Sequence, residues 1–212
     1  ANAPSIGTGL WTTSGSGVFV NENNEGTTVT NLDRGENVLR WTVTSTCGSD
    51  YNEVVITNNV PTVSVAGVDK TVCSTKAAIN ANVPVIGTGV WSTTGSATFS
   101  NVNNANTTVG NLDPGNNQFT WTISSGCGSF TDNIIVRNNI ASLPIAGDSE
   151  TICLSNNYTL DANKPVIGKG KWTTTGGAVF VDDEKYNTVV NNLDEGANRL
   201  TWTVSSSCTS NS

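Results

Sequence analysis

Apolar and polar residues alternate in a stretch that occurs three times along the chain. In the middle occurrence, Phe119, Trp121 and Ile123 alternate with Thr120 and Thr122. A period of two is typical of a strand with one face on a core and the other in water. No segment has a convincing apolar period of about 3.6 residues, so the chain is predicted to be all-β. The same alternation surrounds two further tryptophans, Trp41 and Trp202.

A second motif, Gly-x-Gly-x-Trp, recurs at the same interval. The tryptophans of both motifs repeat after 80 and then 81 residues. The extra residue falls in the stretch 154–157, because Cys73 and Cys153 are 80 residues apart but the next tryptophan comes one residue later in the third copy. Such an interval fits a small domain with its own core. We therefore expect three domains, the first without its opening strands and the last without its closing strand, as in a segment of a longer protein. Their ranges are 1–59, 60–139 and 140–212.

The middle copy is complete and contains seven short stretches with strand patterns. Turn-forming Gly, Asn, Asp and Pro residues separate them. About seven short strands in about 80 residues predict an immunoglobulin-like β-sandwich. The expected strands are 62–66, 76–82, 88–94, 97–100, 107–110, 118–124 and 129–137.

The orientation of the first tryptophan in each copy follows from its neighbour. The position before it is Leu10, Val90 or Lys171. A position that accepts lysine points outward, so the adjacent tryptophan points inward. The alternative is a platform for sugar rings, which an exposed Trp or Tyr on one sheet face would indicate. All six tryptophans are predicted to lie in the cores: Trp11, Trp41, Trp91, Trp121, Trp172 and Trp202.

An Asn-Leu-Asp-x-Gly motif precedes each alternating strand. Its aspartates are Asp33, Asp113 and Asp194. Asp followed by Gly at this spacing is typical of a tight turn, in which the carboxylate bonds to nearby backbone. A calcium site is the alternative. Calcium takes about six or more oxygen ligands, and no cluster of carboxylates accompanies the motif, so a turn is favoured.

Composition narrows the functional classes. The net charge of −7 opposes binding to nucleic acids and to anionic membranes. The chain has no histidine, and therefore no His-based catalytic triad. The acidic run 182–184 occurs only in the third copy and is expected to be solvated rather than a catalytic pair. We expect no catalytic residue, no metal ion and no cofactor.

The five cysteines recur at fixed repeat positions, as structural disulfides of an extracellular protein do. Proximity favours Cys73 with Cys127 and Cys153 with Cys208, inside the repeats. In an immunoglobulin-like topology, however, the two cysteines of one repeat lie at opposite ends of strands of about eight residues, roughly 25 Å apart. A disulfide allows only about 7 Å between Cα atoms. An inter-repeat bond between Cys73 and Cys208 is therefore favoured, with Cys47, Cys127 and Cys153 pairing with cysteines that lie outside residues 1–212 of the longer protein.

Several motifs together resemble a known family. They are Ala-Gly-x-Asp-x-Thr-x-Cys at 66–73, Gly-x-Gly-x-Trp, and Asn-Leu-Asp-x-Gly-x-Asn with the later Trp-Thr and Cys-Gly. The order resembles the PKD-like, immunoglobulin-like repeats of giant surface adhesins in Bacteroidota, in particular SprB-like gliding-motility adhesins. The resemblance covers the whole chain, although Lys169 and Lys171 depart from it. It implies export by type IX secretion and a place on the bacterial cell surface.

The sequence thus predicts a non-catalytic structural and adhesive segment of a surface filament or stalk. Its expected partners are neighbouring repeats of the same chain, together with surface glycans or other filament subunits. The alternative is an array of carbohydrate-binding modules in a secreted glycan-degrading protein. Glycan-array binding by a fragment of two repeats would distinguish the two hypotheses.

Overall fold

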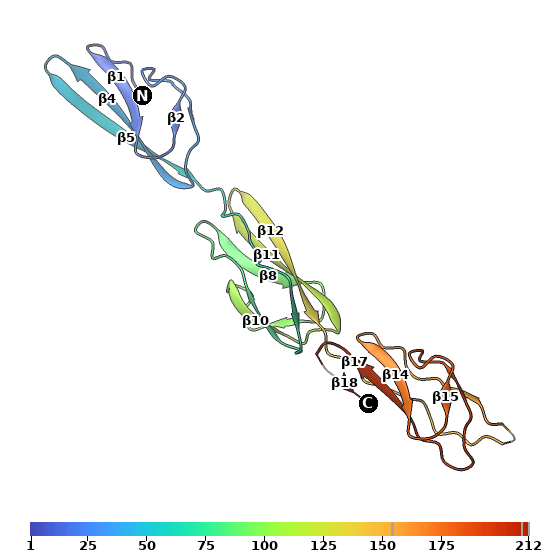
Figure 1. Ribbon diagram of the computed structural model, residues 1–212. Coiled ribbons are helices and arrows are strands. Elements are labelled where there is room, and N and C mark those ends of the chain that lie inside the picture. The colour runs from blue at the N-terminus through green and yellow to red at the C-terminus, as the bar shows by residue number, and fades with distance from the viewer. Residues whose placement is uncertain (154, 209, 212) are drawn as a thin grey trace. The chain divides into compact units, whose positions relative to one another are not determined.

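The computed structural model describes residues 1–153, 155–208 and 210–211 (Figure 1). Leu154, in the stretch expected to hold the extra residue, lies outside the described residues. Every regular element among the described residues is a β-strand. The chain forms two compact units: unit 1 comprises Ala1–Ser64, Val83–Val90 and Thr122–Thr131, and unit 2 comprises Val65–Asn82, Trp91–Trp121 and Asp132–Ser212.

The strands follow the three sequence repeats. In the first repeat they are β1 (Thr8–Thr13), β2 (Val18–Phe19), β3 (Val29–Thr30), β4 (Gly35–Ser45) and β5 (Gly48–Asn58). In the second they are β6 (Lys70–Val72), β7 (Ala77–Asn80), β8 (Thr88–Thr93), β9 (Thr98–Phe99), β10 (Asn106–Gly110), β11 (Gly115–Ser125) and β12 (Gly128–Asn138). In the third they are β13 (Tyr158–Thr159), β14 (Lys169–Thr174), β15 (Val179–Phe180), β16 (Val189–Asn191), β17 (Leu200–Ser205) and β18 (Ser210–Asn211).

The middle repeat has an immunoglobulin-like topology. Its sheets have the strand orders β7-β10-β9 and β6-β12-β11-β8. The short edge strand β6 is parallel to β12, and Val72 lies opposite Asn138. The second, fourth and fifth strands of the repeat thus form one sheet, and the third, sixth and seventh belong to the other, as in an immunoglobulin sandwich. The all-β, immunoglobulin-like fold class therefore holds for this chain.

One of the strands expected from the sequence is not formed. Residues 62–66 form no regular strand, and the short edge strand β6 follows instead at Lys70–Val72. Val65 N–H donates to the side-chain oxygen of Asn82 over 2.8 Å, and Asn82 N–H donates to Val65 O over 2.9 Å. Isolated backbone bonds and the side chain of Asn82 thus hold this stretch in place of the continuous ladder that alternation alone predicts.

Paired tryptophans occupy the repeat cores. Trp11 lies opposite Trp41 in the β1–β4 ladder, and Trp172 lies opposite Trp202 in the β14–β17 ladder. The ring centroids of these pairs are 5.3 and 5.1 Å apart, within the range of favourable aromatic contacts. In the middle repeat, the rings of Trp91 and Trp121 are also 5.1 Å apart. Five of the six indoles are buried, and Trp11 is partly buried.

The Gly-x-Gly-x-Trp motif has a steric reason. A Cβ atom on Gly9 would overlap the ring of Trp41, and one on Gly170 would overlap the ring of Trp202. The glycine thus leaves room for the tryptophan of the neighbouring strand to lie flat across it.

The aspartate motif forms a turn closed by a second residue, the asparagine four positions later. Asn117 accepts from Asp113 N–H over 2.9 Å and donates to Asp113 O over 2.9 Å. The aspartate carboxylate bonds to a facing loop: Ser96 Oγ donates to Asp113 over 2.8 Å. In the first repeat, side-chain and backbone hydrogen bonds from Ser16 hold the pKa of Asp33 below its usual value. The equivalent closure in the third repeat joins Asp194 and Asn198.

Substituting Gly170 by alanine should destabilise the third repeat. Overpacking against the Trp202 ring is expected to cost about 1–3 kcal/mol of unfolding free energy. Urea unfolding followed by tryptophan fluorescence measures the loss. Gly26→Ala is the matched control, because a Cβ there meets only Asn24 Oδ1 at 3.5 Å. A loss no larger than that of the control would contradict the steric account.

Millimolar calcium should leave the melting temperature unchanged, because the aspartates bond to their own turns rather than converging on an ion. Differential scanning calorimetry with calcium and then with a chelator provides the test. A rise of several degrees that the chelator reverses would show that Asp33, Asp113 or Asp194 binds the ion.

Candidate functional site: the cysteine joint

A disulfide bond joins the second and third repeats. It connects Cys73, directly after β6, with Cys208, after β17. The two residues are 135 positions apart in sequence, and their Cα atoms are 5.2 Å apart. Neither in-repeat alternative forms, because Cys127 and Cys153 are free and exposed. Both half-cystines belong to unit 2.

Asn139 connects the segments around this bond. Its N–H donates to Val72 O over 2.9 Å, next to Cys73. Its side-chain Nδ2 donates to Ser207 Oγ over 2.7 Å, and its carbonyl accepts from Ser206 Oγ over 2.6 Å. The linker residue therefore bonds both to the edge strand and to the turn that carry the two cysteines.

The cysteine that follows the second tryptophan strand of each repeat lies in the same kind of turn. The N–H of Cys208 donates to Ser206 Oγ over 3.1 Å, and that of Cys127 donates to Ser125 Oγ over 3.1 Å. Ser125 Oγ also donates to the linker carbonyl of Asn59 over 2.6 Å. Cys47 has the same bond to the serine two residues before it, Ser45, over 3.2 Å. The role of these serines was not predicted, although their constant spacing from the cysteine is visible in the sequence.

The thiols of Cys47, Cys127 and Cys153 are free and exposed in this chain. Their pairing with cysteines outside residues 1–212 stays a prediction. Cys127 and Cys47 lie in turns equivalent to that of Cys208, whereas Cys153 is the counterpart of Cys73 in the third repeat.

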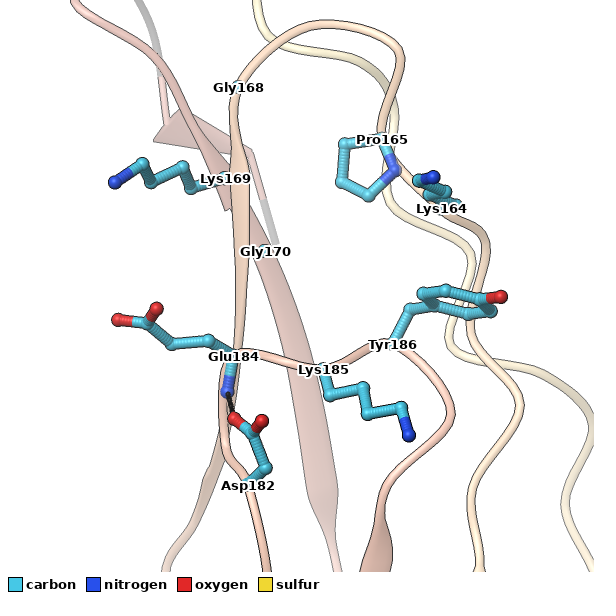
Figure 2. Close-up of a pocket in the computed structure, with 9 residues that line it drawn as sticks. All are labelled: Lys164, Pro165, Gly168, Lys169, Gly170, Asp182, Glu184, Lys185 and Tyr186. Carbon is cyan, nitrogen blue, oxygen red and sulfur yellow. Dashed lines mark hydrogen bonds between the residues drawn. The ribbon is translucent and has the colours of Figure 1, made fainter.

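A separate hollow of about 480 Å³ lies on the third repeat (Figure 2). Figure 2 shows Tyr186 beside Pro165 and Lys164, with Lys169 pointing away on the other side. Asp182 from the acidic run accepts the backbone N–H of Glu184 over 3.0 Å. The next residue, Asp183, forms an exposed ion pair of 3.2 Å with Lys171. These carboxylates thus serve a turn and a surface ion pair.

No group of three or more His, Cys, Asp or Glu side chains suited to a metal ion occurs among the described residues. Within the same residues, no helix is long and apolar enough to cross a bilayer.

Comparison with known proteins gave distant structural likenesses. A scan of protein-family models found no match, and neither did a search of curated proteins. The chain is similar to the I-band fragment I67–I69 from titin, with 12% identity, 96% of this chain and 84% of that chain covered, and a TM-score of 0.48. It is also similar to mouse protocadherin-24 EC1-3, with 13% identity, 96% and 85% covered, and a TM-score of 0.38. Domains 4–9 of surface layer protein SbsC give 12% identity, 92% and 36% covered, and a TM-score of 0.33. Likenesses at this level do not establish what the chain binds or does.

Peptide mapping without reduction should recover one fragment that joins Cys73 to Cys208. Cys47, Cys127 and Cys153 should react with a thiol reagent in the folded chain, because their side chains are exposed. A fragment joining Cys73 to Cys127 would contradict the joint described above.

Proposed function

We propose that this chain is a non-catalytic structural and adhesive segment of a large bacterial cell-surface filament or stalk protein. It comprises three immunoglobulin-like repeats, at residues 1–59, 60–139 and 140–212. The observation that carries the proposal is the disulfide between Cys73 and Cys208, which ties one repeat to the next through covalent bonds.

The contacts made by the residues that recur in each repeat support a structural role. The tryptophans pack against each other in the cores, and the aspartates close turns against facing loops. The cysteine turns bond to the linkers between repeats. Each recurring motif thus has a role in folding or in joining repeats.

The disulfide also supports an extracellular location, because such bonds persist in oxidising compartments. The bacterial surface, type IX export and a role in gliding motility follow from the resemblance to Bacteroidota adhesins and belong to the proposal. Neighbouring repeats are the first partners, and surface glycans or other filament subunits are the candidates for adhesion.

The carbohydrate-binding alternative requires an exposed aromatic platform. The indoles of Trp91, Trp121, Trp172 and Trp202 are each at most 2% exposed. Tyr51 is 56% exposed, but Arg40 lies over its ring at 4.0 Å and the middle repeat has Thr131 at that position. A repeated sugar platform is therefore not favoured.

Single-molecule stretching from the two chain ends tests whether force passes through the disulfide from one repeat to the next. With the disulfide intact, the covalent path passes directly from Cys73 to Cys208, and the residues between them carry no load. Reduction should add the contour length of about 135 residues. At about 3.5 Å per residue, the gain is roughly 470 Å.

The control is the double variant Cys73→Ser/Cys208→Ser, whose extension should not change on reduction. Equal extension of the oxidised and reduced parent chain would contradict the proposal. Binding of sugars on a glycan array by residues 60–212 would favour the carbohydrate-binding alternative instead.

A further inference from the structure

We propose that the hollow on the third repeat is a binding site for an acidic surface glycan, that is, a sugar chain whose rings carry carboxylate groups. The hollow has a volume of about 480 Å³, and two loops and the start of β14 line it (Figure 2). The inference names one class of adhesion ligand and in that respect rests on the proposed function.

The hollow belongs entirely to the third repeat. All of its lining residues lie between Lys164 and Tyr186. The corresponding surface can be inspected in the middle repeat, which has all seven of its strands. There Val83, Gly87 and Thr88 are exposed, as are residues 101–104. The exposure of this surface therefore does not depend on a missing strand.

The backbone framework of the hollow is common to the two repeats. Pro165, Gly168 and Gly170 recur as Pro84, Gly87 and Gly89. The φ angles of the first glycine of each pair are 98° and 96° in the third and middle repeats. The two repeats thus shape this surface in the same way.

The side chains on that framework differ at six positions. In place of Lys164, Lys169, Asp182, Glu184, Lys185 and Tyr186, the middle repeat has Val83, Thr88, Asn101, Asn103, Asn104 and Ala105. The third repeat therefore carries five ionised groups and an aromatic ring where the middle repeat carries none. Residues that the fold does not need, placed together on a shared framework, are typical of a site added to a fold.

Hydrogen bonds hold both loops of the hollow in place. Trp172 N–H in β14 donates to Asp183 O over 2.7 Å. In the other loop, Ser142 Oγ accepts the N–H groups of residues 166 and 167 over 3.1 and 2.9 Å. The lining side chains thus extend from an ordered backbone, which lowers the entropic cost of binding.

Basic residues concentrate around this hollow although the chain is acidic. Of the 10 Lys and Arg residues in a chain of net charge −7, four are Lys164, Lys169, Lys171 and Lys185, and all four are exposed. Lys171 forms the ion pair with Asp183. Within the described part of the chain, no ion pair involves the other three. Their ammonium groups are therefore available to a carboxylate ligand.

The other lining groups favour a sugar acid over a peptide with acidic side chains. Tyr186 packs partly against the core and also lines the hollow, with Pro165 beside it (Figure 2). These two rings offer an apolar surface to the C–H face of a sugar. The carboxylates of Asp182 and Glu184 accept hydrogen bonds from hydroxyl groups and repel further acidic side chains. A uronic acid ring supplies a carboxylate, hydroxyl donors and an apolar face together.

NMR titration of the ¹⁵N-labelled chain with the trisaccharide of galacturonic acid tests the site. We expect saturable shifts of the amides in residues 164–170 and 182–186, with a dissociation constant on the order of 1 mM for a shallow, exposed site. Two matched probes separate the features of the ligand. The methyl-esterified trisaccharide keeps the rings without charge, and triglutamate keeps the carboxylates without sugar. Both should bind more weakly.

Variants with the residues of the middle repeat isolate the lining, because the same framework already accepts them. Lys185→Asn, after Asn104, should raise the dissociation constant about threefold or more through the loss of an ion pair. Tyr186→Ala, after Ala105, should raise it about fivefold or more through the loss of the stacking surface. Lys76→Asn removes an exposed lysine of the middle repeat and should leave it unchanged. Melting curves check that each variant is folded.

Unchanged affinity in the folded Lys185→Asn and Tyr186→Ala variants, or no saturable shift in residues 164–170 and 182–186, would overturn the site. Equally tight binding of the esterified probe would overturn an acidic ligand. Equally tight binding of triglutamate would overturn a glycan as the ligand.

The same variants assign a signal on the glycan array. A signal that Tyr186→Ala abolishes comes from this single adhesion site, whereas one that survives indicates repeated carbohydrate-binding modules. None of the substitutions affects Cys73 or Cys208, on which the stretching experiment depends. The glycan site and the proposed function therefore fail separately.

Discussion

The disulfide bond between Cys73 and Cys208 joins the edge strand of the second repeat to the last turn of the third repeat. A disulfide that closes a loop of 135 residues lowers the conformational entropy of the unfolded chain. This effect should stabilise the folded state by about 4–5 kcal/mol. Its position depends on two local features. The parallel ladder of β6 on β12 fixes the end of the edge strand, and the Ser206 turn fixes Cys208.

Inside each repeat, the dominant constraint is the contact between two tryptophans on adjacent strands. The glycine of the Gly-x-Trp sequence is required because the opposite indole occupies the space of its side chain, as at Gly170 and Trp202. The Asn-Leu-Asp-x-Gly turn then leads the chain into the second tryptophan strand. The motifs recur together because every repeat needs the same three parts: the pair of tryptophan strands, the turn between them, and the cysteine turn that connects it to the neighbouring repeat.

Much of the fold was predictable because period-two alternation and a fixed interval are strong signals. The strands around Trp121 and the turn at Asp113 follow from such patterns. The edge strand β6 could not be predicted in this way, because a strand of three residues is too short to show an alternating pattern. The stretch 62–66 does alternate, but it forms no regular strand and bonds partly to the side chain of Asn82. The roles of Asn117 and Ser125 were also missed, since a polar side chain that closes a turn resembles a solvated one in sequence.

We propose that the disulfide couples the second and third repeats, so that a pull on the chain passes through the Cys73–Cys208 bond and the folded residues between the two cysteines are spared the load. Scanning calorimetry of the chain and of Cys73→Ser/Cys208→Ser tests it most directly. The melting temperature of the residues within the loop should fall by about 10 °C or more in the variant, while that of the first repeat should not move. Superimposable transitions in the two proteins would contradict it.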